Sequence, residues 1–136
     1  MTTEIIYKGQ LRTDCKHLQS GTVIETDAPT DNNGKGERFS PTDLIATALG
    51  SCILTTMAIK MEGEIDLTGT RLEVTKVMAA NPRRIGEIKI DIYFPENLQA
   101  DDRQKTMLEN LAHACPVSKS LHPDLKQTIN FFYGRS

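Results

Sequence analysis

A run of uncharged residues at positions 44–59 constrains the fold more than any other part of the sequence. Just before this run, Ser40 can cap a helix, Pro41 suits the first helical position, and Asp43 places a carboxylate in the first turn. These signals predict a helix over residues 40–61. A helix without charge on any face is typical of one surrounded by protein, not of one lying on a surface. We therefore expect a central core helix.

A membrane-spanning helix is the competing interpretation of this run. Spanning a bilayer takes about 20 consecutive, predominantly apolar residues. The uncharged run has only 16 residues, and Thr47, Ser51, Thr55 and Thr56 make it partly polar. We therefore expect no membrane segment.

Length and charge narrow the class of protein. A chain of 136 residues is the size of one domain, so we expect a single domain over residues 1–136. The 16 basic and 18 acidic residues give a net charge of −2 and no single-signed field. Electrostatics therefore do not indicate nucleic acid or an anionic membrane as a partner, and a small molecule is the expected ligand.

The start of the chain and its cysteines indicate a compartment. The sequence MTTEIIYKGQ alternates from its first residues and shows no charged segment followed by an apolar one, so secretion is not indicated. Three cysteines, Cys15, Cys52 and Cys115, have no regular spacing, which fits a reducing environment. We expect a cytoplasmic protein.

Periodicity predicts the remaining elements. Alternation of apolar and polar residues is typical of strands, most clearly in EIKIDIYF, and an apolar stripe against a charged back is typical of a surface helix. A polar, glycine-containing loop over residues 28–38 leads to the core helix. The expected strands cover residues 3–9, 11–18, 21–27, 71–78, 87–94 and 125–133, and the further helices cover residues 99–114 and 116–121. This order predicts an α+β fold in which sheets wrap helices.

The cysteines are the residues that raise the question of chemistry. A lone cysteine inside a helix, as Cys52 is, is more often a small hydrophobic residue than a reactive one. Cys115 precedes Pro116 at the start of a short helix, where unpaired N–H groups favour a thiolate. The sequence therefore predicts Cys115 to be the more acidic thiol, and Cys15, in an exposed strand, to be incidental.

A metal site is the alternative use of these residues. His113, Cys115 and His122 lie within ten residues of one another, and Cys52 is a conceivable fourth ligand. The segment lacks the paired cysteine or histidine spacing of structural zinc sites. We therefore expect no metal and no cofactor, with both histidines at the surface.

Two segments resemble the OsmC/Ohr family. FSPTDLIATALGSCILTTM is similar to the segment that carries that family's peroxide-reacting cysteine, and HACPVSKSL is similar to the segment of its resolving cysteine. Both segments match in the right order, and the order of strands and helices extends the resemblance over nearly the whole chain. It implies an intertwined homodimer in which antiparallel sheets wrap around long buried central helices, with two active sites at the interface.

The resemblance also implies a mechanism. Cys52 as thiolate would attack the O–O bond of a hydroperoxide, and Cys115 would trap the resulting sulfenic acid as a disulfide. An external dithiol or a lipoylated protein would then reduce that disulfide. Burial of an alkyl tail would favour organic hydroperoxides, since the residues expected around Cys52 are apolar. These residues are Leu49, Ile53, Leu54 and Met57.

The chain departs from the family at the position of an acidic residue. The family holds its activating arginine with a glutamate ten residues before the reactive cysteine, where this chain has Thr42. Asp43 does not replace it, because nine helical residues at about 100° each place its side chain opposite Cys52. Glu37 and Arg38, in the loop before the helix, are therefore our first candidates for the acid and the activating cation.

Other arginines and other functions stay open. Arg12 is placed like the arginine of some family members, whereas Arg83 and Arg84 follow Pro82 in what is most simply a solvated turn. The missing glutamate motivates a second hypothesis, a binding module that holds a small molecule without peroxidase turnover. A structural dimer with inert buried cysteines is the third.

Overall fold

The structure, a computed structural model, describes residues 1–134 of the chain. These residues form two compact units, one over residues 1–45 and one from Ala46 onward. The expectation of a single domain over the whole chain stays a prediction.

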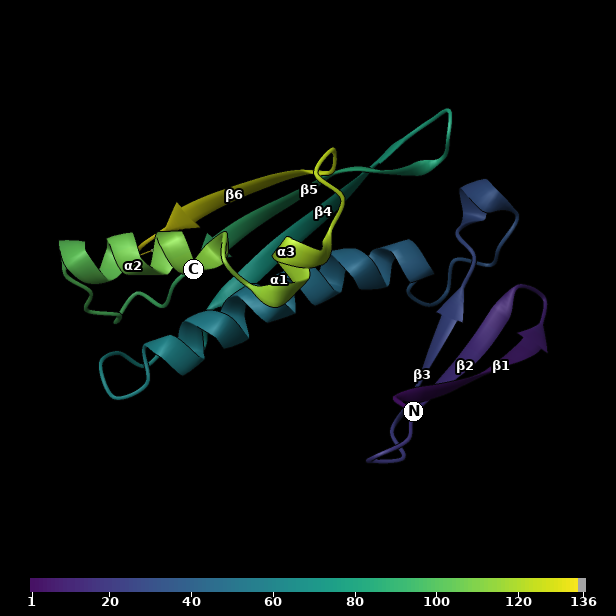
Figure 1. The fold of residues 1–136 in the computed structure, drawn as a ribbon, viewed down its shortest axis with the longest axis horizontal. Coiled ribbons are helices and arrows are strands. Elements are labelled where there is room, and N and C mark those ends of the chain that lie inside the picture. The colour runs from purple at the N-terminus through teal and green to yellow at the C-terminus, as the bar shows by residue number, and fades with distance from the viewer. Residues whose placement is uncertain (135–136) are drawn as a thin grey trace. The chain divides into compact units, whose positions relative to one another are not determined.

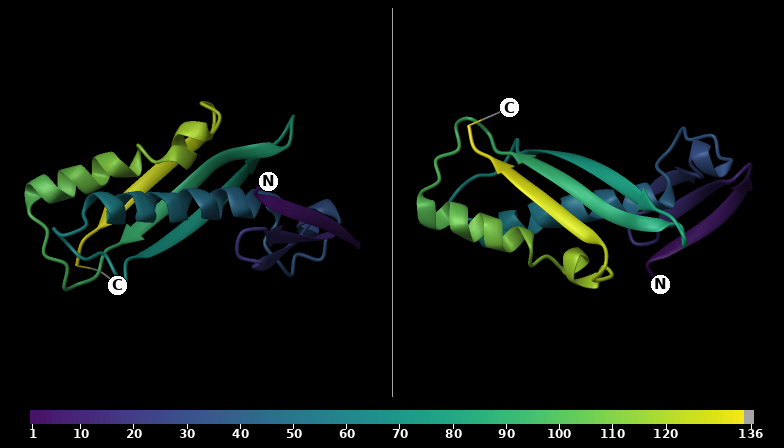
Figure 2. Two further views of the ribbon diagram at one scale, coloured as in Figure 1. Left: turned by 60° about the horizontal axis from the view of Figure 1, so that its bottom comes forward. Right: turned by 90° about the horizontal axis from the view of Figure 1, so that it is seen from above.

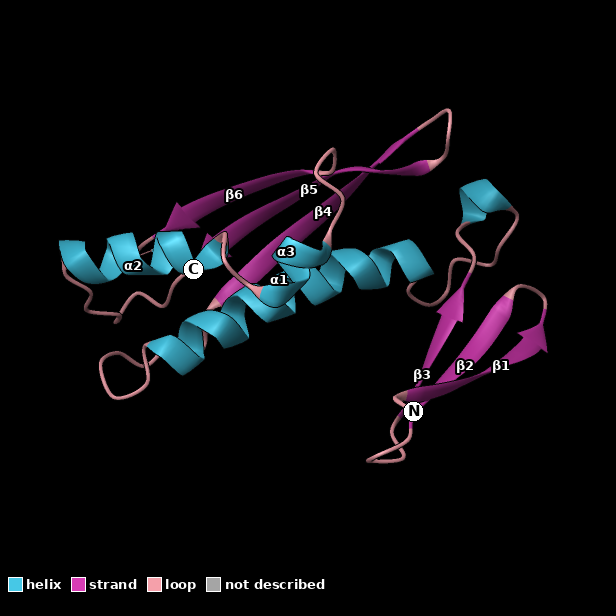
Figure 3. Ribbon diagram, viewed as in Figure 1, coloured by secondary structure: helices cyan, strands magenta, loops and turns pink. Residues whose placement is uncertain are grey.

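The first unit contains a three-stranded antiparallel sheet (Figure 3). Its strands are β1 (Thr3–Gly9), β2 (Arg12–His17) and β3 (Val23–Asp27), in that order across the sheet. All three fall inside the predicted strands. Residues that lie directly opposite each other share a face, so Ile5, Cys15 and Ile24 line one face of this sheet.

The loop after β3 is tied back onto its own strand. It contains a short 3-10 helix, η1 (Thr30–Asn32), and returns so that the backbone N–H of Asp27 donates to the carbonyl of Phe39. A Cβ atom at Gly34 would lie 1.7 Å from the carbonyl oxygen of Ala28, which no side chain tolerates. Glycine at this position is therefore a requirement of the tight loop.

Helix α1 (Pro41–Lys60) begins where the sequence predicts. The Ser40 hydroxyl accepts from the backbone N–H of Asp43 at 3.0 Å, and the Asp43 carboxylate accepts from the backbone N–H of Ser40 at 3.0 Å. These two bonds satisfy N–H groups that the first turn of a helix leaves without intrahelical partners.

Helix α1 is less buried than its composition predicts. By length and composition it is the one helix of the described chain that could cross a membrane. Its buried residues instead lie on one stripe, as in a helix packed on a sheet, while Ile59 is 69% exposed. The stripe consists of Ala46, Leu49, Gly50, Ile53 and Met57. Three strands cover only one side of the helix, and burial of its other faces by a partner chain stays a prediction.

The second unit holds a second three-stranded sheet, made of β4 (Arg71–Ala79), β5 (Arg84–Tyr93) and β6 (Lys126–Phe132). Strands β4 and β5 are antiparallel, but β6 runs parallel to β5. An all-antiparallel arrangement was expected and is wrong for this pair. The chain returns through two helices after β5, so β6 starts at the same end of the sheet as β5 (Figure 1).

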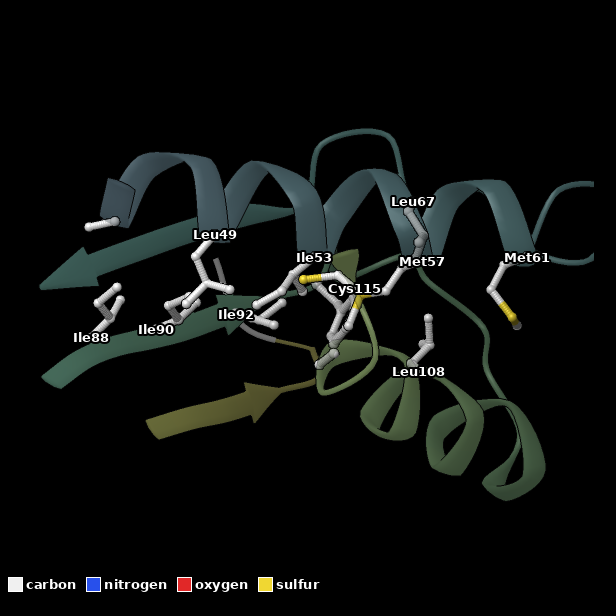
Figure 4. Packing of buried hydrophobic residues seen from close by; sticks show 13 residues of the cluster. Leu49, Ile53, Met57, Met61, Leu67, Ile88, Ile90, Ile92, Leu108 and Cys115 are labelled. Carbon is white, nitrogen blue, oxygen red and sulfur yellow. The ribbon is translucent and has the colours of Figure 1, made fainter. Parts of the chain in front are cut away.

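The two returning helices are α2 (Asp102–Ala112) and α3 (Pro116–Ser120). Asp101 and Gln104 form a reciprocal capping box at the start of α2. Helices α1 and α2 lie on the same face of the β4–β6 sheet (Figure 2). Together with strand β5 they contribute to one apolar cluster, and residues of α3 pack against it (Figure 4). The cluster includes Leu49, Ile53 and Met57 of α1, Ile88, Ile90 and Ile92 of β5, Leu108 and Ala112 of α2, and Cys115. This arrangement confirms the α+β class.

Candidate functional site

Two cysteines that are 63 positions apart in the sequence meet in the second unit. Cys52 lies in the middle of α1, and Cys115 is the residue before α3. The Cys52 side chain lies close enough to Cys115 to raise the pKa of that thiol. Both thiols are free. The fold therefore brings together two reduced cysteines that are far apart in the sequence.

Cys52 is the more accessible thiol of the two. It is half-buried and packs against the edge of the apolar cluster. One helical turn later, the hydroxyl of Thr56 lies 4.0 Å from its sulfur. A hydroxyl at that position can donate a weak hydrogen bond to a thiolate. Part of the surface of this residue is therefore exposed to solvent.

Cys115 is completely buried, with 0% of its surface exposed. Its side chain lies among those of the apolar cluster (Figure 4). It caps α3, and its sulfur accepts from the backbone N–H of Ser118 at 3.4 Å. Burial nevertheless raises the pKa of the Cys115 thiol, the Ser118 N–H only partly offsets this, and the Cys52 thiol raises it further. The sequence predicted an acidic Cys115 from its helix start, and this was wrong because burial outweighs that effect.

The apolar residues expected around Cys52 divide into two groups. Leu49, Ile53 and Met57 are each 0% exposed and pack within the apolar cluster. Leu54 faces a cavity of about 670 Å³ between the second half of α1 and the loop that follows it. Leu49, Ile53 and Met57 therefore belong to the packed core beside Cys52. Leu54 belongs to the open cavity, which lies farther along the same helix.

In the first unit, an arginine is held by acidic groups. The Arg12 guanidinium donates to both carboxylate oxygens of Asp27, from Nε at 2.7 Å and from Nη2 at 2.8 Å. Its Nη2 also donates to the Glu37 carboxylate at 2.9 Å. Hydrogen bonding to Arg12 lowers the pKa of Asp27 from 3.8 to about 2, against the opposing effect of burial. Donating to Asp27 in turn raises the pKa of Arg12, which stays charged.

The expected pairing of the Glu37 and Arg38 side chains is wrong. Glu37 was expected to orient Arg38, but its carboxylate binds Arg12, and only its backbone carbonyl accepts from Arg38. The Arg38 guanidinium donates instead to the Glu25 carboxylate at 3.0 Å. The reason is geometric, since neighbouring residues of an extended loop point in different directions, whereas β2 and β3 bring Arg12 and Asp27 opposite each other.

Asp27 is the residue that sequence reasoning missed. A signal was present, because Arg12 starts one predicted strand and Asp27 ends the next. In an antiparallel pair joined by a short turn, the start of one strand lies opposite the end of the other. Applying that register to residues 11–27 would have placed the two side chains together.

The remaining candidates lie outside the cysteine pair. His113 ends α2 at the surface, and exposed His122 accepts from the backbone N–H of Asp124. Arg84 donates to two backbone carbonyls of its own turn. Half-buried Cys15 contacts the Thr13 hydroxyl at 3.6 Å. Within residues 1–134, no three histidine, cysteine or acidic side chains gather in a way that could hold a metal ion.

Comparison with known proteins identifies the family. Residues 34–130 match the family model described as OsmC-like protein. A crystal structure of a candidate osmotic stress induced and detoxification response protein from Psychrobacter arcticus is 53% identical, with a TM-score of 0.91 over 97% of this chain and 96% of that one. A comparison with curated proteins gave no match.

More distant structures share the fold. An organic hydroperoxide resistance protein OsmC from Legionella pneumophila has a TM-score of 0.74 at 14% identity, over 96% of each chain. The organic hydroperoxide resistance protein OhrB of Bacillus subtilis has a TM-score of 0.64 at 17% identity, over 97% of this chain and 98% of that one. The matched segment contains both cysteines of the candidate site. This chain belongs to the OsmC-like protein family.

Proposed function

We propose that this protein reduces organic hydroperoxides with external thiols, as part of a response to oxidative stress. The observation that carries the proposal is that Cys52, a partly exposed residue, lies close enough to the completely buried Cys115 to act on its thiol. Membership of the OsmC-like family supports the proposal, and so does the similarity in fold to two proteins named for organic hydroperoxide resistance.

The first step is peroxide cleavage at Cys52. Its thiolate attacks one peroxide oxygen, the O–O bond breaks, and the other oxygen leaves as an alkoxide that takes up a proton to become the alcohol. Cys52 then carries a sulfenic acid. The sulfur is oxidised by two electrons, and the peroxide is reduced by the same two.

The second step closes the disulfide. The Cys115 sulfur attacks the sulfenic sulfur of Cys52, the S–O bond breaks, and the hydroxyl leaves with the Cys115 proton as water. An external reductant, either a small dithiol or a lipoylated protein, then reduces the disulfide. The reductant is itself oxidised to a cyclic disulfide. No cofactor takes part in this sequence.

A cation is needed to hold Cys52 as thiolate, because partial burial opposes the charge. Arg38 with Glu37 was the first choice from the sequence. The described contacts favour Arg12 over Arg38, because two bonds to Asp27 and one to Glu37 fix its guanidinium. A fixed cation loses little conformational freedom when it binds an anion. We therefore propose Arg12 as the activating arginine, with Asp27 in the role of the family's acid.

The proposal is tested by turnover of cumene hydroperoxide or a fatty-acid hydroperoxide with a dithiol. We expect steady turnover by the wild type, none by Cys52→Ser, and a single turnover that ends in sulfenic acid for Cys115→Ser. Cys15→Ser is the matched control and should turn over normally. A fully reduced wild-type protein that consumes no hydroperoxide would overturn the proposal.

A binding module without turnover is the second candidate function. Two observations favour it, namely Thr42 at the family's acidic position and the cavity of about 670 Å³ beside α1. The cavity has apolar walls from Leu54, Ala58 and Leu67 and is therefore suited to an apolar small molecule. In that case, a fluorescent apolar probe should bind to the wild type and to Cys52→Ser with equal affinity, and neither protein should turn over peroxide.

A further inference from the structure

The buried half of the cysteine pair has its own hydrogen-bond donor. The Cys115 sulfur accepts from the backbone N–H of Ser118 at 3.4 Å. This bond stabilises a negative charge on the sulfur, and the backbone N–H of Val117 adds a smaller effect of the same sign, whereas burial and the neighbouring Cys52 thiol oppose a charge. The position of the Ser118 N–H, the larger of the two favourable effects, therefore influences how readily Cys115 carries a charge.

Gln127 on β6 holds Ser118 by two bonds. The Ser118 hydroxyl donates to the Gln127 side-chain oxygen at 2.6 Å, and the Gln127 side-chain nitrogen donates to the Ser118 carbonyl at 3.3 Å. Gln127 itself is fixed in the sheet, where it lies opposite Ile88 of β5. The side chain thus connects the short helix α3 to the sheet at the residue whose N–H faces Cys115.

Resting on the proposed function, we propose that Gln127 is a positioning residue for the reduction of the disulfide. It holds the Ser118 N–H against Cys115, so that an external thiol opens the disulfide by attacking Cys52, and Cys115 leaves as the thiolate. The direction of attack follows from access. A thiolate must reach the sulfur that it attacks, and Cys115 is 0% exposed whereas Cys52 is half-buried.

The step balances as a thiol–disulfide exchange. The reductant sulfur forms a bond to Cys52, the bond between Cys52 and Cys115 breaks, and its electron pair stays on Cys115. The second thiol of a dithiol then attacks the reductant's own sulfur and releases Cys52. Exchange is faster when the leaving thiol is more acidic, and burial raises the pKa of Cys115. The Ser118 N–H counteracts this effect when the bond breaks.

The direction of attack can be measured without any peroxide. Diamide would install the disulfide in the wild-type protein, and glutathione, a monothiol, would then open it and remain attached as a mixed disulfide. Peptide mass mapping should find glutathione on Cys52. Glutathione on Cys115 would overturn the proposal. Because diamide replaces hydroperoxide, this result is independent of whether the protein is a peroxidase, which the turnover assay decides.

The role of Gln127 is measured by the rate of the same opening reaction. Gln127→Leu keeps the side-chain size and removes both bonds, so the rate should fall about tenfold, as expected for one displaced hydrogen bond to a charged group. Asn130→Leu is the matched control, because Asn130 lies on the same strand and donates to Asp91 on the other face of the sheet. Its rate should equal that of the wild type, and an unchanged rate in Gln127→Leu would overturn the role.

A second variant distinguishes a positioning role of Gln127 from a general effect of the substitution on the fold. Ser118→Ala removes only the hydroxyl bond to Gln127 and should slow the opening less than Gln127→Leu does. In both variants glutathione should stay on Cys52. If either variant instead shifts glutathione to Cys115, the substitution has exposed the buried thiol, and Gln127 has a structural role only.

Discussion

Arg12 and Asp27 are joined by two hydrogen bonds of 2.7 and 2.8 Å, one to each carboxylate oxygen. The Asp27 side chain is fully buried, and the Arg12 side chain is 21% exposed. A paired, planar contact of this kind fixes the direction of the guanidinium more firmly than a single bond does. Asp27 therefore holds the Arg12 guanidinium in a fixed orientation, where β2 begins and β3 ends.

Substitution of arginines should identify the cation that activates Cys52. We expect Arg12→Met to slow alkylation of Cys52 by iodoacetamide at neutral pH by about tenfold or more, because a thiolate loses a charged partner. Arg38→Met is the matched comparison, since Arg38 binds the exposed Glu25 carboxylate. Loss of reactivity in Arg38→Met with normal reactivity in Arg12→Met would restore the assignment made from the sequence.

The buried Asp27 should make the first unit sensitive to acid. Its pKa is lowered from 3.8 to about 2, so its ionised form stabilises the fold above pH 3.8, and this contribution is lost as the pH falls toward about 2. Circular dichroism of acid unfolding should show this in the wild type. Asp27→Asn should be less stable at neutral pH, and its difference from the wild type should shrink over the same interval. A stability difference between wild type and Asp27→Asn that does not change with pH would contradict the lowered pKa of Asp27.

Exposed apolar residues predict a second copy of the chain. On β1, Ile5 and Tyr7 are 59% and 63% exposed, and on α1, Ile59 is 69% exposed. An interface that covers such surfaces should bury more than about 2,000 Å² in total, as obligate dimers do. Light scattering at micromolar concentration should give twice the mass of the chain, 15.1 kDa. A stable monomer would contradict the intertwined homodimer.

Close packing at Gly50 should make α1 intolerant of a large side chain. A Cβ atom at this position would lie 3.2 Å from Val74 and 3.4 Å from Leu72 of β4. Gly50→Leu should therefore lower the free energy of unfolding by about 1–3 kcal/mol. Gly50→Ala should change it by less than about 1 kcal/mol, because a gain in helix propensity offsets the tight contact. Chemical denaturation measures both, and a Leu variant as stable as the wild type would contradict the packing.

The hydroxyl of Tyr133 has no hydrogen-bond partner within residues 1–134, although its oxygen is buried. Burial raises its pKa to about 12. The fold should therefore lose stability as the pH rises from about 10, the ordinary tyrosine pKa, through 12. Tyr133→Phe removes the unpaired group and should be as stable as the wild type or up to about 1 kcal/mol more stable.

Tyrosinate absorbance during alkaline titration gives the matching readout for Tyr133. The wild type should show one tyrosine that ionises near pH 12, and this component should be absent from Tyr133→Phe. A clear loss of stability in Tyr133→Phe at neutral pH would mean that the hydroxyl does have a partner in the assembled protein.

Local patterns in the sequence determined most of the secondary structure. Ser40, Pro41 and Asp43 predicted the start of α1, and the alternation in EIKIDIYF predicted the core of β5, because caps and strand periodicity depend on neighbours within a few residues. The two cysteine segments also predicted the family, which the comparisons confirm.

Tertiary packing decided the chemistry of those residues. The burial of Cys115, its contact with Cys52 and the pairing of Arg12 with Asp27 all join residues from different elements. A pKa or a side-chain partner depends on everything that surrounds a group in space, so a helix start alone could not predict the state of Cys115. The parallel direction of β6 was likewise settled by how the chain returns to its sheet, which no local pattern records.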